Sequence, residues 1–179
     1  VAIFDSLVDH TNPDLANVVR EFSEDEQRAL GCGQWGYNAS LAGGQSADSF
    51  SADDHATHCA GVIGASWDGS GVSGVASDVS IVSVQVSEFD MEDSIALSSM
   101  LRGFAFVDRY NNACATADEK IRVVSASIGF VTSTRSIDAA VRELGSQHGT
   151  VTVMSAGNSR GNKDADLLFG SSLAQNPYA

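Results

Sequence analysis

VAIFDS, residues 1–6, is the stretch that decides the fold class. Its first four residues form a continuous apolar run, and Asp5 and Ser6 follow directly. A short run of this kind is typical of a strand that is buried on both faces of a parallel sheet. Ligand sites in such sheets lie outside the carboxyl ends of the strands. Asp5 is therefore the first candidate functional residue.

Hydrophobic periodicity predicts further helices and strands along the chain. We expect a helical piece within residues 14–30 (around Leu15, Val18, Val19 and Phe22), helices at 55–65, 93–110 and 136–147, and strands at 79–86, 121–128 and 151–154. Residues 31–54 are acidic and rich in Gly and Ser, and we expect them to form a long loop. The alternation of strand and helix predicts the α/β class, with a parallel sheet flanked by helices.

The composition limits the kinds of partner. The 179 residues, 43% apolar and 18% charged, suit one globular domain. The 23 acidic and 10 basic residues leave a net charge of -13, which argues against nucleic acid and anionic membranes as partners. No apolar run is long enough to span a membrane. Because Val1 opens directly on the strand-like run, we expect a processed chain.

The three cysteines do not form a dense disulfide framework. They are Cys32, Cys59 and Cys114, and an odd number leaves at least one thiol unpaired within the chain. Cys32 and Cys114 can pair only if the fold brings them together, which spacing alone does not decide.

Four polar segments stand at predicted strand ends or at a helix start: 5–6, 55–58, 127–129 and 156–158. Singly, each fits an ordinary turn, cap or core role. Together they fit acyl transfer from a peptide, which needs a base, an orienting carboxylate and donors to the oxyanion. In that reaction Asp5 orients the imidazole of His55, His55 moves the proton, and the Asn158 amide donates to the oxyanion.

These segments resemble the motifs of the subtilase family of serine proteases. The resemblance rests on VAIFDS followed by NPDL (12–15), on HATHCAG (55–61), GVA (74–76) and SIG (127–129), and on the run 151–158, all in the family's order. It implies a subtilisin-like fold and a serine endopeptidase that cleaves a protein or peptide substrate with an Asp–His–Ser triad. Cys59, after the second histidine of its motif, is similar to the thiol-containing branch related to proteinase K.

The resemblance also implies the substrate-binding residues. Ser127, Ile128 and Gly129 would form one wall of the specificity pocket, and Ser155, Ala156 and Gly157 would form the opposite wall. The thiol of Cys59 would pack beneath the catalytic histidine rather than act as a nucleophile. The chemistry requires no cofactor, and the family's structural calcium is possible, although no motif identifies its site.

The chain departs from the family pattern at three small-residue positions, which hold Leu7, Ala56 and Phe130. The catalytic serine also lacks a convincing candidate. GSSLA (170–174) imitates its motif, but only 13 residues lie between Asn158 and Ser172. We therefore expect residues 1–179 to be the amino-terminal portion of a peptidase domain.

On this interpretation the serine is supplied by sequence not in this chain. The chain would be part of a nicked enzyme, a truncated chain, or one chain of a two-chain assembly, and it would be inactive alone. Residues 176–179 would lead toward the next strand, and the sheet would end in an open, apolar edge.

Other interpretations compete with the protease. A non-catalytic subtilase-like binding or regulatory domain is the main alternative, and a generic α/β binding domain is a weaker one. GSGVSG (69–74) imitates a dinucleotide motif but precedes a strand instead of following one. His55, His58 and Cys59 lack the spacing and glutamate of a known zinc motif, so no metal site is expected. The acidity and the resemblance imply a secreted or extracytoplasmic protein.

Overall fold

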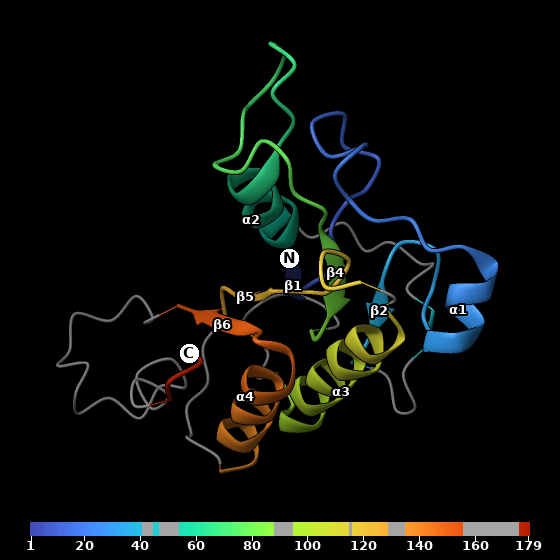
Figure 1. The fold of residues 1–179 in the computed structure, drawn as a ribbon. Helices are drawn as coiled ribbons and strands as arrows, with labels where there is room; N and C mark the ends of the chain where they lie inside the picture. The colour runs from blue at the N-terminus through green and yellow to red at the C-terminus, as the bar shows by residue number, and fades with distance from the viewer. Residues whose placement is uncertain (41–44, 47–53, 88–94, 115, 129–134, 156–175) are drawn as a thin grey trace, which may run out of the picture.

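The computed structural model describes residues 1–40, 45–46, 54–87, 95–114, 116–128, 135–155 and 176–179 (Figure 1). Its strands are β1 Ala2–Asp5, β2 Tyr37–Asn38, β3 Gln45–Ser46, β4 Val82–Gln85, β5 Val123–Ala126 and β6 Val151–Met154. Its helices are α1 Glu24–Leu30, α2 Asp54–Gly64, α3 Leu97–Ala113 and α4 Arg135–His148. No helix in these ranges is long and apolar enough to cross a membrane.

The strands form one sheet in the order β3-β2-β4-β1-β5-β6. Neighbours from β2 to β6 pair in parallel, and β3 pairs antiparallel with β2 at one end. The strand β1 therefore lies inside the sheet, between β4 and β5. The α/β class with a largely parallel sheet, predicted from the sequence, is confirmed.

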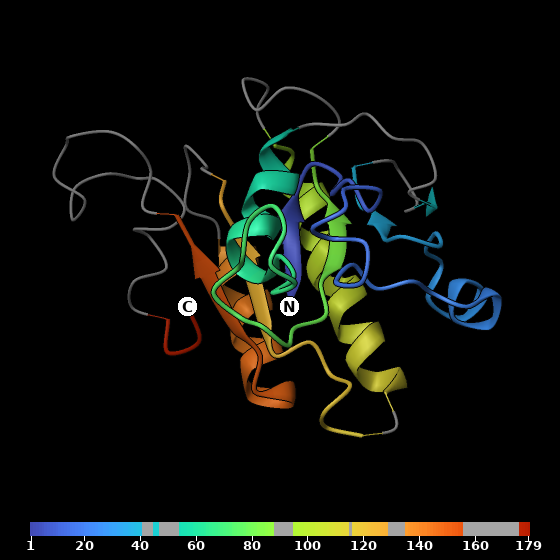
Figure 2. The same cartoon turned by 90° about the horizontal axis from the view of Figure 1, so that it is seen from above.

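Helices cover both faces of the sheet (Figures 1 and 2). The helix α2 lies on one face, and α3 and α4 lie side by side on the other. Successive residues of β1 point to opposite faces, as in any strand. Phe4 packs against Phe104 of α3, with 5.0 Å between the ring centroids, whereas Ile3 belongs to the core cluster beneath α2. Burial on both faces explains why β1 is apolar at consecutive positions.

The helix expected within residues 14–30 is confined to α1, so its predicted centre around Leu15–Phe22 was wrong. Val19 forms an isolated bridge with Ile81. The apolar residues before α1 are buried, although they lie in turns and extended segments and not in a helix. The helix begins after Ser23, whose hydroxyl accepts from the Glu26 N–H while the Glu26 carboxylate accepts from the Ser23 N–H. This capping box satisfies backbone donors and sets the start of α1.

The long loop expected at 31–54 contains strands β2 and β3, which is a second correction. The ring of Tyr37 in β2 stacks on Phe106 of α3, with centroids 4.4 Å apart and planes at 4°. Pairing with β4 and this aromatic contact hold β2 in the sheet, and neither is visible as local periodicity. The remaining elements lie where they were predicted, with bounds moved by a few residues.

The strand β6 ends the described sheet on the side away from β2. The side chains of Val151 and Val153 are 44% and 54% exposed, so they lie on a partly uncovered face of β6. Residues 176–179 lie beside this strand, because the Tyr178 carbonyl accepts a hydrogen bond of 2.7 Å from the Thr152 N–H. Tyr178 also packs against α4 at Gly145.

Candidate active site

Asp5 is the last residue of β1 and is completely buried. Its Oδ1 accepts a hydrogen bond of 2.8 Å from the Ser6 N–H and a longer one of 3.4 Å from the Ser6 hydroxyl. The strand carries the carboxylate to the end of the sheet, and the turn that follows supplies donors to it. The carboxylate is thus held in one orientation by its own neighbour in sequence.

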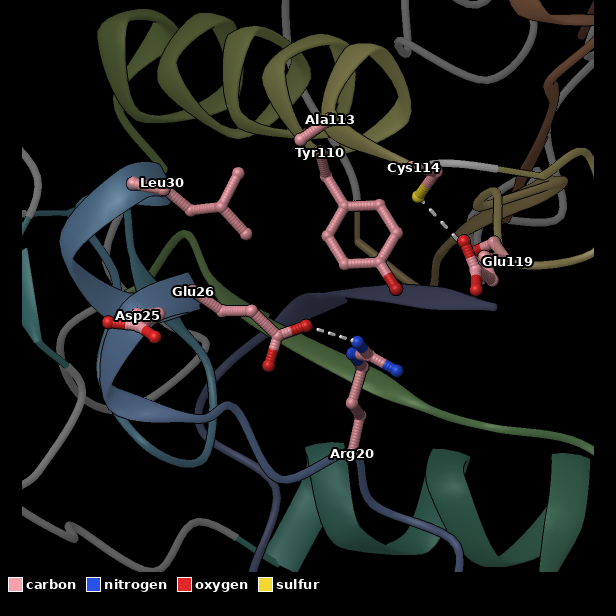
Figure 3. A pocket seen from close by; sticks show the side chains of 9 residues that line it. Arg20, Asp25, Glu26, Leu30, Tyr110, Ala113, Cys114 and Glu119 are labelled. Atoms are coloured by element: carbon pink, nitrogen blue, oxygen red, sulfur yellow. Dashed lines mark hydrogen bonds and ion pairs between the residues drawn. The ribbon is translucent and has the colours of Figure 1, made fainter.

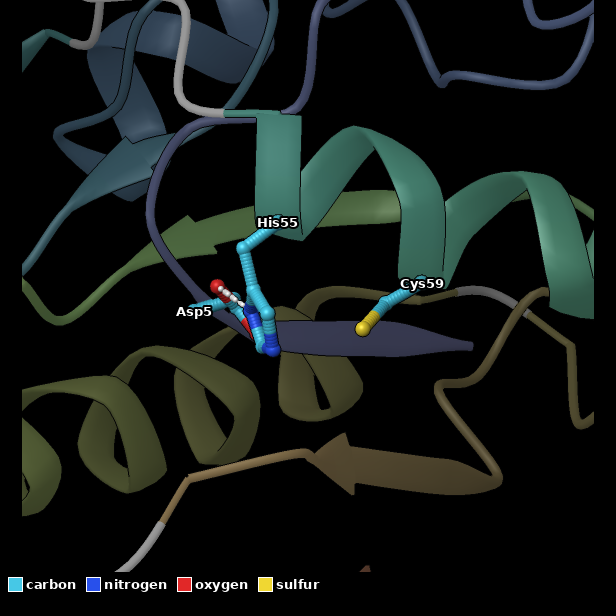
Figure 4. Close-up of side chains that lie close together, drawn as sticks. All are labelled: Asp5, His55 and Cys59. Atoms are coloured by element: carbon cyan, nitrogen blue, oxygen red, sulfur yellow. Dashed lines mark hydrogen bonds and ion pairs between the residues drawn. The ribbon is translucent and has the colours of Figure 1, made fainter. Parts of the chain in front are cut away.

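His55 is the second residue of α2, and its side chain is 38% exposed. Its Nδ1 lies 2.9 Å from Oδ1 and 3.0 Å from Oδ2 of Asp5 (Figure 4). With the Asp5 carboxylate ionised, the imidazole nitrogen is the donor in this pair, which leaves Nε2 as the basic nitrogen of the neutral ring. A buried carboxylate behind a solvent-facing imidazole is an arrangement suited to proton transfer.

The helix α2 brings His55 to Asp5 because it packs closely on the sheet. Ala56, Ala60 and Gly64, spaced four residues apart, form the buried side of α2. Their small side chains allow the helix to approach β1. The Asp9 N–H donates to the Thr57 hydroxyl at 3.0 Å, which fixes the segment after Asp5 to the same helix.

The departure from the family pattern at Ala56 is accommodated by this packing. The residue lies inside α2, where the backbone is right-handed, and its methyl group is fully buried. A glycine is therefore not required at that position. Leu7, the departure next to Ser6, is also buried.

The environment of Asp5 opposes its ionisation. Burial raises the pKa of Asp5, and the hydrogen bonds from His55 and Ser6 lower it, but burial is the larger effect. A buried carboxylate that retains its charge must be stabilised by such partners. The protonation of Asp5 is thus coupled to the imidazole in front of it.

Cys59 lies one turn after His55, on the same side of α2 (Figure 4). A carboxylate oxygen of Asp5, a ring nitrogen of His55 and the Sγ of Cys59 all lie within 4.8 Å of one another. Burial raises the pKa of the Cys59 thiol, against a lowering by a hydrogen bond with the Ser127 side chain. A protonated thiol is a poor nucleophile, which agrees with the packing role expected for this residue.

Two of the predicted segments at the strand ends meet in the structure. Ser127 and Ile128 follow β5, and Ser155 follows β6. The Ser155 hydroxyl donates to the Ile128 carbonyl at 3.0 Å, so the two segments lie side by side. The Ile128 side chain is buried in the core, so only its backbone can take part in a pocket wall. Gly129, Ala156, Gly157, Asn158 and Ser172 lie outside the described residues.

The segment 69–74 runs between α2 and β4, with positive φ at Gly69 and Gly71, so it does not open a helix as a dinucleotide motif does. His58 does not join His55 at Asp5. It lines a separate hollow of about 360 Å³ together with Asp14, Thr57 and Val62.

A second hollow, of about 420 Å³, lies between α1 and the end of α3 (Figure 3). Glu26 binds Arg20 there at 2.6 Å, and Cys114 stands at its rim. Cys32, Cys59 and Cys114 are all free thiols, so the possible pairing of Cys32 with Cys114 is absent from the structure. Burial raises the pKa of Cys32 to about 11, which makes that thiol unreactive.

The fold and the pair at its strand end define an α/β protein with an Asp–His site. The sequence pattern of the subtilase family, peptidase family S8, matches residues 1–176. The chain therefore belongs to the subtilase family. The resemblance stated from the sequence motifs is confirmed at this level.

Known proteins agree with this assignment. The minor extracellular protease Epr of Bacillus subtilis (strain 168) is 32% identical over 124 residues, which is 66% of this chain and 17% of Epr. Fervidolysin from Fervidobacterium pennivorans, described as a keratinolytic enzyme related to subtilisin, has a TM-score of 0.63 at 24% identity, over 93% of this chain and 22% of that one. A protease from Pseudoalteromonas arctica has a TM-score of 0.65 at 20% identity, over 91% of this chain and 50% of that one. The structural likenesses show the fold, and the chain spans half or less of each of these relatives.

Proposed function

We propose that this chain carries the aspartate and histidine of a serine endopeptidase. One observation carries the proposal: the Nδ1 of half-exposed His55 is bound to both oxygens of fully buried Asp5, at 2.9 and 3.0 Å, at the carboxyl end of an interior parallel strand. Membership of the subtilase family supports it.

In this mechanism His55 accepts the proton of a serine hydroxyl as that oxygen attacks the peptide carbonyl, and returns the proton to the leaving amine. Asp5 keeps the imidazole in the required tautomer and stabilises its cation. Asn158 is proposed to donate its side-chain amide to the oxyanion, a contribution worth about 10²–10³ in rate. No cofactor enters these steps.

The substrate is proposed to be an extended peptide held between the segments 127–129 and 155–157. The bond from Ser155 to the Ile128 carbonyl supports the idea that the two segments border one site. Small residues on both sides would leave room for a large side chain of the substrate. We also propose secretion, a view that the name of the extracellular protease Epr supports.

The nucleophile is proposed to come from outside residues 1–179 rather than from Ser172. Structural calcium is an expectation that rests on the family resemblance alone. Calcium takes six to eight oxygen ligands. Among the residues that the structure describes, the one group of three candidate ligands contains a nitrogen and a sulfur, so no calcium site is assigned.

A serine-directed fluorophosphonate probe tests the proposal. The 179-residue chain alone should not react, and the protein as its source produces it should be labelled in a His55-dependent manner, because the probe requires an activated serine. Ser172→Ala should leave the labelling unchanged. Mass spectrometry of the labelled peptide identifies the nucleophile.

Absence of labelling in the natural protein would support the non-catalytic binding or regulatory domain instead. Labelling of the 179-residue chain that disappears in Ser172→Ala would show that the serine had been assigned wrongly. Folding of each variant is checked by circular dichroism, so that loss of labelling is not confused with unfolding.

A further inference from the structure

Four exposed apolar side chains gather on the last turn of α2 and on the loop that follows it. Val62, Trp67, Val72 and Val75 are 54%, 63%, 60% and 84% exposed, and we call these four residues the apolar patch. Figure 1 shows that this loop lies on the side of the sheet opposite α3 and α4. Of the seven exposed large apolar side chains in the described ranges, four belong to the patch. Single exposed apolar residues are ordinary, but a group of them marks an interaction surface.

Hydrogen bonds hold the apolar patch together. The Val75 N–H donates to the Val62 carbonyl at 3.0 Å, so the loop returns to the helix at this point. The Trp67 Nε1–H donates to the Gly74 carbonyl at 2.7 Å, which fixes the indole ring against the residue before Val75. Gly74 contacts the end of α2 so closely that a Cβ atom would clash with the helix backbone. The patch is therefore preorganised, and binding through it loses little conformational entropy.

A hollow of about 360 Å³ borders the apolar patch, since Val62 and Val72 also line the hollow. Asp14 and Asp54 contribute carboxylates to its lining. Asp14 Oδ2 accepts a hydrogen bond of 3.0 Å from the Val72 N–H, which fixes that carboxylate beside the patch. Within the described part of the chain, neither carboxylate forms an ion pair with a lysine or arginine. A side chain that enters the hollow therefore meets negative charge that no neighbouring cation neutralises.

The charge around the apolar patch selects the sign of its partner. No lysine or arginine occurs in the sequence between Arg28 and Arg102. Asp68, within the loop, and Asp78, shortly after Val75, are both exposed. An acidic partner would be repelled by this rim, whereas a partner with basic residues around an apolar centre is complementary to it.

We propose that the apolar patch and its hollow bind a basic amphipathic segment of a partner protein. Apolar side chains of that segment pack on Trp67 and Val75, and one lysine or arginine side chain extends into the hollow. Its aliphatic stem contacts the valines at the border, and its charged end reaches the two aspartates. The Asp–His pair takes no part in this binding, so the proposal stands or fails independently of the proposed peptidase function.

A fluorescein-labelled synthetic peptide, with leucines on one helical face and lysines on the other, tests the surface on the 179-residue chain. Fluorescence anisotropy should show saturable binding that weakens with added NaCl, because salt screens exposed charges. Trp67→Ala should raise Kd by about tenfold or more, because it removes the aromatic anchor at the centre of the surface. Asp68→Asn should raise Kd by less than about fivefold, because its charge is exposed at the rim.

Val153→Ser is the matched control for Val75→Ser, because it removes an exposed valine from β6 at the end of the described sheet. Val75→Ser should weaken binding, and Val153→Ser should leave Kd unchanged. Val75→Ser also serves as the second variant if Trp67→Ala fails to fold, which circular dichroism checks. A peptide of the same composition in scrambled order, without an apolar face, should bind at least about tenfold more weakly.

Two results would overturn the proposal. One is an unchanged Kd in folded Trp67→Ala and Val75→Ser, or equal binding of the ordered and scrambled peptides, since the net charge of the chain would then explain the binding. The other is a dimer of the chain alone, seen by sedimentation, that Trp67→Ala abolishes. That dimer would show that a second copy, rather than a basic partner, occupies the patch.

Discussion

Two histidine–aspartate pairs with opposite burial lie within the described part of the chain. In the first, the Asp5 carboxylate is completely buried and the His55 side chain is 38% exposed, with Nδ1 at 2.9 Å from Oδ1. In the second, the His148 side chain is 4% exposed and Asp108 is 40% exposed, with Nε2 at 2.8 Å from Oδ1. Both distances are ordinary hydrogen bonds, so distance alone does not distinguish the pairs.

The direction of burial suits the two pairs to different roles. His55 faces outward with a charge behind it, so its ring can exchange a proton with a bound molecule. His148 is enclosed at the end of α4, and its Nδ1 is buried with no hydrogen-bond partner among the described residues. Its bond to Asp108 connects α4 to α3, which is a structural function. On the proposed function, the accessible imidazole of the first pair can move a proton to or from a substrate, whereas the enclosed imidazole of the second cannot.

The largest effect that separates the pairs is expected in catalysis. On the proposed function, His55→Ala should lower kcat/KM of the natural protein by about 10⁴-fold or more, because the general base is removed. His148→Ala should leave kcat/KM close to that of the wild type. Steady-state kinetics with a peptide substrate measures both variants under conditions in which circular dichroism shows them folded.

The second effect is on stability, and here the buried pair should be the sensitive one rather than the accessible pair. His148→Ala should lower the free energy of unfolding by about 1–3 kcal/mol, because it empties a buried site and breaks the bond between α3 and α4. Urea unfolding followed by fluorescence measures the change. His58→Ala, at an exposed position, is the matched control and should be nearly neutral. Equal losses in the two variants would contradict the structural role of His148.

The smallest effect concerns pH and the buried carboxylate. Burial raises the pKa of Asp5 above its ordinary value of 3.8, so the folded state binds a proton more readily than the unfolded state. The contribution of Asp5 to stability is therefore greatest at low pH, and it is lost as pH rises from 3.8 through the folded pKa. Asp5→Asn removes this dependence.

Asp5→Asn should thus gain stability relative to the wild type as pH rises from acid to neutral, while losing activity. Unfolding free energies from about pH 4 to about pH 8 test this. The same substitution in a His55→Ala background isolates the carboxylate from the imidazole. A difference that shrinks with rising pH would show that the hydrogen bonds, rather than burial, dominate at Asp5.

Local sequence was enough for some of the helix and strand assignments and failed for others in ways that have physical causes. The periodicity of α4 and the apolar run of β1 predicted both elements, because α4 buries one face in the core and β1 is buried on both faces. The start of α1 was missed although the capping signal Ser23-x-x-Glu26 is present in the sequence. The strand β2 is only two residues long, and its place depends on pairing with β4, which no local pattern encodes.

The sequence by itself determined the family, the parallel α/β class, and the identity of Asp5 and His55 as candidates, because motif order and hydrophobic period are local properties of the chain. Only the tertiary structure decided which residues meet. Asp5 and His55 are 50 positions apart, and their contact depends on how closely the small side of α2 packs on β1. The structure also placed the Cys59 thiol beside that pair, where the family resemblance expects it, and showed that His148 and Asp108 form a pair with the opposite burial, since accessibility depends on the whole packed molecule.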